Sequence, residues 1–249
     1  MREKRIGAFN ILPIAWKLWR RVPVAKIINR KWFYGLPFYT NKHTLDPRPD
    51  SETLVEAVLA NEKNARHILD LGTGSGCLLC AILKNMPHVT GVGIDKSFRA
   101  RRVAQRNISE LGLADRAWVV KGTFRGIGVH LGSADVIISN PPYIPDGDLR
   151  VDRGARHDPR MALYGGADGL KFYREIALLG NVVGRPSMKA DVAFHRKATH
   201  QEYPRLKLYL EIGVGQGAAV TKIFRDAGWQ PIAQFKDLSG RVRTLSFAK

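Results

Sequence analysis

An apolar run at residues 134–139 ends abruptly at Asn140, and Pro141, Pro142 and Tyr143 follow it at once. Each proline fixes its own backbone angle and pushes the preceding residue to an extended geometry, so the carbonyls of this stretch are expected to be rigid and to face a crevice. The Asn140 side-chain oxygen and the Pro141 carbonyl can each accept one N–H of a planar NH2 group, while Tyr143 can stack on its flat face. Such acceptors would aim the nitrogen lone pair at a methyl donor. The stretch therefore predicts a binding site for the NH2 group of an amide or a nucleobase. The alternative is a loop that the prolines only make rigid.

A glycine-rich loop, DLGTGSG at residues 70–76, follows one predicted strand and begins a helix. Glycines let the backbone turn sharply and approach a ligand closely. The spacing of Gly72, Gly74 and Gly76 is one residue shorter than the dinucleotide fingerprint, and the loop lacks the lysine of a phosphate-binding loop. A nucleoside ligand without phosphates fits better, and Asp95, at the end of the next strand, can accept hydrogen bonds from its ribose. We therefore expect S-adenosylmethionine as the cofactor, with a tight structural turn as the alternative.

From His67 onward, short apolar runs alternate with helical patterns, which is typical of a doubly wound α/β sheet. Strands are expected at residues 67–71, 90–95, 116–120, 134–139 and 205–212, and helices at about 75–85, 97–112, 168–182 and 215–227. The last two apolar runs, QPIAQFKD and RVRTLSF, predict a hairpin with an antiparallel final strand. We expect a seven-stranded Rossmann-like sheet with its ligand crevice beyond the carboxyl ends of the strands.

The two cysteines, Cys77 and Cys80, have a C-x-x-C spacing that would suit a metal or redox site. The surrounding GCLLCAIL is apolar on every side, as in a helix buried against a sheet, so we interpret both as core side chains. We expect no metal site, and we place His195 and His200 on the surface.

The formal net charge of +18 is the most unusual bulk property of the chain. It attracts nucleic acid, ribosomes or acidic proteins, although a solvated basic surface is the alternative. Residues 1–31 carry nine basic side chains and one acidic side chain, and residues 185–207 are also rich in basic side chains. These two segments are the candidates for contact with the ribosome or RNA.

No apolar run reaches the length of about 18 residues that suggests a membrane span. Two cysteines are the usage of a reducing compartment, and the absence of Ser and Thr before Thr40 is unlike an organelle transit peptide. We expect a cytoplasmic monomer that makes no membrane contact.

Several segments together resemble the protein-(glutamine) methyltransferases that modify the Gly-Gly-Gln loop of peptide chain release factors, a class I family that uses S-adenosylmethionine. The resemblance covers about residues 33–249, in which the segments FYGLPFYTNKHTLDPRPDSE, DLGTGSG, SNPPYIP, HDPRMALYGGADGLKFYREI, LEIGVGQ and KDLSGRVR occur in the family's order. It implies transfer of a methyl group to the side-chain amide nitrogen of the glutamine.

The resemblance also implies a role for each motif. The methionine part of the cofactor would contact Gly72, Thr73, Gly74, Ser75 and Gly76, and Asp95 would hold its ribose. The glutamine would be held by Asn140, Pro141, Pro142 and Tyr143, with Asn140 also beside the cofactor. Phe124 would stack on the adenine, although the acidic residue usual in the family is missing from this stretch.

The N-terminus departs from the family. A separate helical domain usually comes first, and here it is reduced to a basic helical remnant at residues 1–32, ahead of a methyltransferase domain expected at residues 33–249. Because the glycine loop lies in the second part, removal of residues 1–31 is expected to weaken binding of the protein substrate and to spare the cofactor.

Three other functions fit part of the sequence. The same Asn-Pro-Pro-Tyr chemistry serves enzymes that methylate an exocyclic amine of adenine or guanine in nucleic acid, and the charge suits a polyanion. A glutamine methyltransferase acting on a ribosomal protein is a closer alternative. A basic binding protein that kept the fold without turnover is a third, which the intact cofactor loop disfavours.

Overall fold

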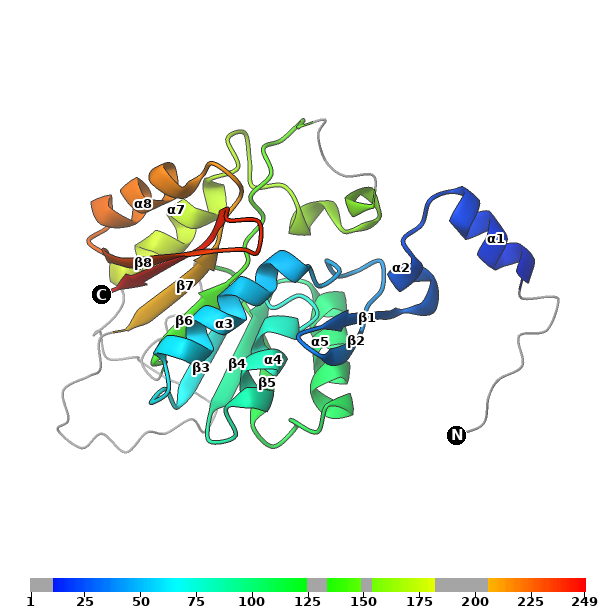
Figure 1. The fold of residues 1–249 in the computed structure, drawn as a ribbon, viewed down its shortest axis with the longest axis horizontal. Helices are drawn as coiled ribbons and strands as arrows, with labels where there is room; N and C mark the ends of the chain where they lie inside the picture. The colour runs from blue at the N-terminus through cyan, green and yellow to red at the C-terminus, as the bar shows by residue number, and fades with distance from the viewer. Residues whose placement is uncertain (1–10, 125–133, 149–153, 182–205) are drawn as a thin grey trace.

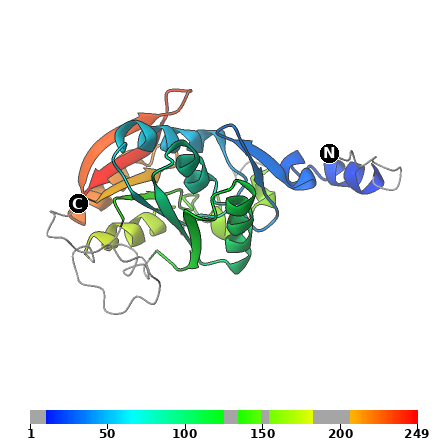
Figure 2. The ribbon, with the colours of Figure 1, turned by 90° about the horizontal axis from the view of Figure 1, so that it is seen from below.

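The structure, a computed structural model, describes residues 11–124, 134–148, 154–181 and 206–249 (Figure 1). Its N-terminal part consists of α1 (Ile11–Trp19), α2 (Val24–Ile28) and a hairpin of β1 (Arg30–Phe33) and β2 (Leu36–Tyr39). Figures 1 and 2 show α1 and α2 at one end of the molecule, away from the main sheet. The expected N-terminal helical structure is therefore present in α1 and α2, and the expected boundary between residues 32 and 33 falls within β1.

Seven strands form the main sheet, in the order β5-β4-β3-β6-β7-β9-β8. Their bounds are β3 (His67–Leu71), β4 (Thr90–Asp95), β5 (Ala117–Lys121), β6 (Val136–Ser139), β7 (Lys207–Glu211), β8 (Gln230–Lys236) and β9 (Val242–Ala248). The strands from β3 to β7 pair in parallel, and β9 is antiparallel to both of its neighbours. The predicted seven-stranded sheet with an antiparallel C-terminal strand is confirmed.

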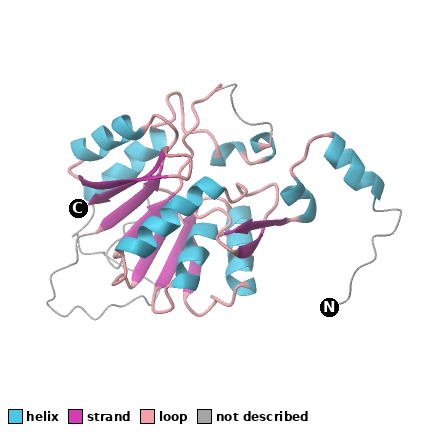
Figure 3. Ribbon diagram, in the orientation of Figure 1, coloured by secondary structure: helices cyan, strands magenta, loops and turns pink. Residues whose placement is uncertain are grey.

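Helices pack on both faces of this sheet because its inner strands are apolar on both faces (Figure 3). Alternate residues of a strand point to opposite faces, so Ile137 of β6 belongs to one core and Ile138 to the other. The core containing Ile138 is covered by α3 (Glu52–Asn61), α4 (Cys77–Asn85) and α5 (Phe98–Glu110). The core containing Ile137 is covered by α7 (Lys171–Ala177) and α8 (Gly217–Asp226). Cys80 is fully buried, as predicted, whereas Cys77 is only partly buried.

The predicted helices are found with adjusted ends. Ser97 caps α5, since its side chain accepts a hydrogen bond from the Ala100 N–H at 3.2 Å. The helix predicted at residues 168–182 begins later, at Lys171, because Gly169 has a φ of +73° that no α-helix contains. A 3-10 turn, η5 (Leu178–Asn181), follows α7, and the last predicted residue of this helix lies outside the described residues.

The sequence interpretation missed the β1–β2 hairpin and α3. The hairpin turns at Tyr34 and Gly35, whose φ angles of +47° and +72° give the backbone twist of a two-residue hairpin turn. A 3-10 turn, η2 (Pro49–Ser51), leads into α3, and this proline-led start was an available signal. His195, His200 and residues 185–205 of the predicted basic segment lie outside the described residues.

Candidate functional site

A cavity of about 370 Å³ lies at the carboxyl ends of the parallel strands, and this volume is within the range of small-molecule sites. Its walls come from residues 43–48, 71–75, 94–97 and 122–124, with parts of 159–164 and 171–175. The predicted site residues that line it are Gly72, Thr73, Gly74, Ser75, Asp95, Phe124, Asn140 and Pro142. Gly76, Pro141 and Tyr143 are not part of this lining. The structure thus brings the glycine loop, the acid and the asparagine to one cavity.

Gly72 and Gly76 of the glycine loop make room for two different neighbours. Gly72 and Gly76 both have positive φ, at +73° and +79°. A Cβ at Gly72 would lie 3.3 Å from the Phe124 ring, so this glycine lets the ring approach the loop. A Cβ at Gly76 would lie 3.3 Å from the Cβ of Ala104 in α5, so Gly76 lets two helices pack and does not face the cavity.

Asp70, at the end of β3, is a buried acid that the sequence interpretation did not single out. Its Oδ2 accepts a hydrogen bond of 2.6 Å from the Thr73 hydroxyl, which holds the loop to the strand end. Burial raises the pKa of Asp70 to about 7, although the hydrogen bond from Thr73 opposes the shift. Its position in the DLGTGSG motif was the available signal.

Asp95 ends β4 as predicted, and its carboxylate already has two backbone partners. Oδ2 accepts a hydrogen bond from the Gly74 N–H (3.0 Å), and Oδ1 accepts one from the Ser97 N–H (2.8 Å). Burial raises the pKa of Asp95, and these hydrogen bonds oppose the shift. Because each carboxylate oxygen has two lone pairs, acceptor capacity is left for a ligand in the cavity.

Asn107 of α5 is a second buried residue that was missed. Its amide joins the hairpin to the glycine loop, because its Nδ2 donates to the carbonyl oxygens of Tyr39 (3.0 Å) and Ser75 (2.8 Å). Its Oδ1 accepts the Tyr39 N–H at 2.7 Å. A polar residue on the apolar face of a predicted helix was the signal that could have found it.

Asn140 lies directly after β6 and borders the cavity. Its Nδ2 donates a hydrogen bond of 3.1 Å to the hydroxyl of Ser51, the residue before α3. With the NH2 end held in this way, the oxygen end of the amide is the end left to accept a hydrogen bond from a ligand. Ser51 also lines the cavity, and the sequence interpretation assigned it no role.

The carbonyls of Pro142 and Tyr143 were expected to face the cavity, but they lie against two glycines of a neighbouring loop. A Cβ at Gly165 would lie 2.5 Å from the Pro142 carbonyl oxygen, and a Cβ at Gly169 would lie 2.3 Å from the Tyr143 carbonyl oxygen. The Tyr143 carbonyl also accepts a hydrogen bond of 2.9 Å from the Gln216 side chain. These two carbonyls therefore lie close to Gly165 and Gly169.

Tyr143 has its hydroxyl 3.5 Å from Oε1 of Glu211, which ends β7. Burial raises the pKa of Glu211 to about 7, while hydrogen bonding from Ser51 and the charge of Arg243 oppose the shift. Arg243 forms ion pairs of 2.6 Å with Asp50 and 3.0 Å with Asp237. A polar cluster therefore lies beside Ser51, the hydrogen-bond partner of Asn140.

Phe124 borders the cavity with Gly122 and Thr123. Its ring packs against Phe172 of α7, with the ring centroids 5.1 Å apart. Glu175, one turn further along α7, also lines the cavity, and it was not predicted.

Among the described residues, no group of three or more His, Cys, Asp or Glu side chains is placed to hold a metal ion. In the same part of the chain, no helix has the length and apolar character needed to cross a membrane.

Comparisons with known proteins identify this chain as similar to methyltransferases. The family model of the methyltransferase small domain matches residues 42–155. The chain is 42% identical over 228 residues to a release factor glutamine methyltransferase of Rhodospirillum rubrum, covering 90% of this chain and 64% of the relative. It is 37% identical over 235 residues to a release factor glutamine methyltransferase of Caulobacter vibrioides, covering 91% of this chain and 73% of the relative. The chain thus spans somewhat under two thirds of the first of these relatives.

Solved structures share the fold at low sequence identity. The catalytic domain of hMettl16, determined in complex with a 3'UTR hairpin, superposes with a TM-score of 0.59 at 15% identity. The match covers 86% of this chain and 76% of that domain. At this identity the likeness concerns the fold alone.

Proposed function

Because the chain belongs to the family of release factor glutamine methyltransferases, we propose that it transfers a methyl group from S-adenosylmethionine to the side-chain amide nitrogen of the glutamine in the Gly-Gly-Gln loop of peptide chain release factors. The observation that carries this proposal is the position of Asn140, which borders the same cavity as the glycine loop and Asp95. A release factor as substrate also supports the cytoplasmic location expected from the sequence.

The cavity suits S-adenosylmethionine. When bound, this cofactor supplies an electrophilic methyl group on a sulfonium centre. The loop of Gly72 to Ser75 offers a close approach to backbone, Asp95 has acceptor capacity for ribose hydroxyls, and Phe124 presents an aromatic face for the adenine. We assign the cofactor to these residues, with Gly76 in a supporting role behind the loop.

Asn140 would orient the glutamine amide. Its Oδ1 would accept one N–H. The other would go to the carbonyl of Pro141, which is not itself a lining residue but lies between the lining residues Asn140 and Pro142, and the two bonds would turn the nitrogen lone pair toward the methyl group. The hydrogen bond to the Ser51 hydroxyl favours this orientation of the Asn140 amide. Orientation of this kind can contribute roughly 7 to 11 kcal/mol to barrier reduction. Pro142 borders the same space, and Tyr143 is assigned to the outer part of the substrate site, beside Glu211.

The decisive experiment is Asn140→Ala. This variant removes the acceptor but leaves the proline-fixed backbone and the glycine loop in place. We expect S-adenosylmethionine to bind nearly as in the wild type, while the methylation rate of release factor falls on the order of a hundredfold. A near wild-type rate in the folded variant would refute the role assigned to Asn140.

The choice of substrate is tested separately. The purified protein is incubated with labelled cofactor and with separated release factors, ribosomal proteins and RNA, and the label is mapped by mass spectrometry. Label on a glutamine of the release factor supports the proposal. Label on an exocyclic base amine, or on a ribosomal-protein glutamine, would identify one of the two alternative substrates.

The described N-terminal residues support contact with RNA, including that of the ribosome. Residues 11–45 contain no acidic residue, and Trp16, Trp19 and Trp32 are 55%, 79% and 64% exposed. Basic side chains neutralise phosphates, and exposed aromatic rings stack on bases. Replacing Arg20 and Arg21 by Gln should lower RNA affinity at low salt, with a smaller loss at high salt. Unchanged affinity at low salt would contradict this assignment.

A further inference from the structure

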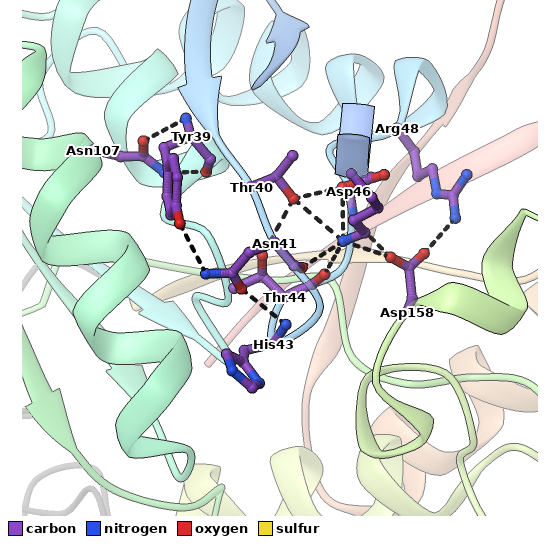
Figure 4. Close-up of polar contacts among 10 residues, drawn as sticks. Tyr39, Thr40, Asn41, His43, Thr44, Asp46, Arg48, Asn107 and Asp158 are labelled. Atoms are coloured by element: carbon purple, nitrogen blue, oxygen red, sulfur yellow. Dashed lines mark hydrogen bonds and ion pairs between the residues drawn. The ribbon is translucent and has the colours of Figure 1, made fainter. Parts of the chain in front are cut away.

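The ammonium of Lys26 is buried, although no residue of α2, the helix that carries it, is fully buried. The Lys26 side chain is 5% exposed, and its Nζ lies within reach of five oxygen atoms. They are Oδ1 of Asp46 (2.8 Å), Oδ1 of Asp158 (2.9 Å), the carbonyl oxygens of Asn41 (2.7 Å) and Thr44 (2.6 Å), and Oγ1 of Thr40 (3.3 Å). The residues that carry these oxygens are labelled in Figure 4. A buried charge, and not a buried apolar face, therefore attaches α2 to the rest of the protein.

The oxygens around Lys26 belong to two stretches that are far apart in the sequence. One is the segment of residues 40–46, which follows β2, and the other is Asp158, which follows the 3-10 turn η3 (Ala155–His157). Both stretches continue into the cavity, where residues 43–48 form one part of the wall and Pro159 begins another. Lys26 thus contacts Thr44 and Asp46, which line the cavity, and Asp158, the residue directly before the lining residue Pro159.

The positive charge of Lys26 compensates the negative charges of two buried carboxylates, Asp46 and Asp158. The side chains of Asp46 and Asp158 are only 8% and 1% exposed. Arg48 supplies a second cation, with its Nη2 at 2.7 Å from Oδ2 of Asp158, but it is 36% exposed. Burial raises the pKa of Asp158, while the charges of Lys26 and Arg48 oppose the shift. Without Lys26, the buried Asp46 would lose the cation that pairs with it, Asp158 would keep only the partly exposed Arg48, and the two carboxylates would repel each other.

We infer that Lys26 is a positioning residue for the cofactor: its ammonium holds residues 40–48 and the Asp158 loop together as one wall of the cavity. The inference rests on the proposed binding of S-adenosylmethionine. It changes the expectation for the N-terminal segment, because removal of residues 1–31 removes Lys26 and should weaken cofactor binding as well as substrate binding.

The test is Lys26→Met, which keeps most of the side-chain volume and removes the charge. We expect the Kd for S-adenosylmethionine, measured by calorimetry, to rise about tenfold or more, because a broken buried ion pair leaves uncompensated charge. In hydrogen-exchange mass spectrometry without cofactor, residues 40–48 and 154–164 should both exchange faster. A lysine that only stabilised the fold would lower the Tm and leave the Kd of the folded protein unchanged, and that result would overturn the inference.

The matched control is Lys222→Met. Lys222 also pairs with an aspartate, Asp226, at 2.7 Å, but its side chain is 76% exposed, so neither the Kd nor the exchange of the two segments should change.

If Lys26→Met does not fold, the charge-balanced variant Lys26→Met/Asp46→Asn replaces it. It should still bind the cofactor more weakly than the wild type, and a wild-type Kd would overturn the inference. A wild-type protein that does not bind S-adenosylmethionine would instead contradict the proposed function, and the exchange data would still test the contact.

Discussion

The side-chain amide of Asn140 donates a hydrogen bond of 3.1 Å to the hydroxyl of Ser51, a residue 89 positions earlier in the chain. The contact joins the end of β6 to the start of α3 at the edge of the cavity. It determines which end of the Asn140 amide is available to a ligand, because the NH2 end is already occupied. The orientation of the central residue of the site therefore depends on a helix that precedes the whole main sheet.

Ser51→Ala should lower kcat for methylation about fivefold, since loss of one hydrogen bond of about 1 kcal/mol leaves the Asn140 amide free to turn. The Kd for S-adenosylmethionine should change little. Helix α3 should remain stable, because the Ser51 side chain makes no capping hydrogen bond. Steady-state kinetics and calorimetry measure both quantities, with the exposed Ser109→Ala as control. A kcat equal to that of the control would show that Ser51 does not orient Asn140.

Gly169→Ala should disturb the site more than Gly147→Ala. Both glycines have positive φ, at +73° and +80°, so both alanines carry a backbone strain of about 1 to 2 kcal/mol. Only the Cβ at position 169 would meet the Tyr143 carbonyl oxygen, at 2.3 Å, whereas the Cβ at position 147 meets nothing within 4 Å. Urea unfolding should therefore show a small loss for Gly147→Ala and a larger one for Gly169→Ala. Initial rates should fall only in Gly169→Ala, and equal rates in the two variants would contradict this account.

Asp95→Ala should weaken cofactor binding, because ribose hydroxyls would lose a charged acceptor whose hydrogen bonds are worth about 1.5 to 3 kcal/mol each at most. The backbone N–H groups of Gly74 and Ser97 would also lose their partner, which adds to the effect. Turnover at saturating cofactor should change less than the Kd. Calorimetry with the exposed Asp115→Ala as control makes the comparison, and an unchanged Kd in Asp95→Ala would place the ribose elsewhere.

Glu211→Gln should change the pH dependence of stability. The folded-state pKa of Glu211 is raised from 4.5 to about 7, so folding favours its protonated form, and stability is lost as the pH rises through this interval. The neutral glutamine does not titrate. The variant should therefore gain stability relative to the wild type between about pH 5 and pH 8, by at most about 3 kcal/mol. Urea unfolding at the two pH values measures the difference, and a difference that is independent of pH would show that Glu211 is ionised at little cost.

The sequence by itself determined the sheet and the place of the site in it. Strands with apolar residues at successive positions must be covered on both faces, and Ile137 and Ile138 do lie in two different cores. The glycine loop and Asn140 each follow a predicted strand directly and Asp95 ends another, so a parallel sheet brings them to the same edge. These features depend on periodicity and on position along one strand, and both are local properties of the chain.

Tertiary structure alone decided which partner each polar side chain finds. Ser51 meets Asn140, the Tyr143 carbonyl turns to Gly169, and Lys26 joins Asp46 to Asp158, all between segments far apart in the sequence. No local pattern specifies such pairs, because a hydrogen bond or ion pair depends on the distance between two atoms to within a few tenths of an ångström. That distance is set by how α2, α3 and the loops pack around the sheet, and packing involves the whole chain at once.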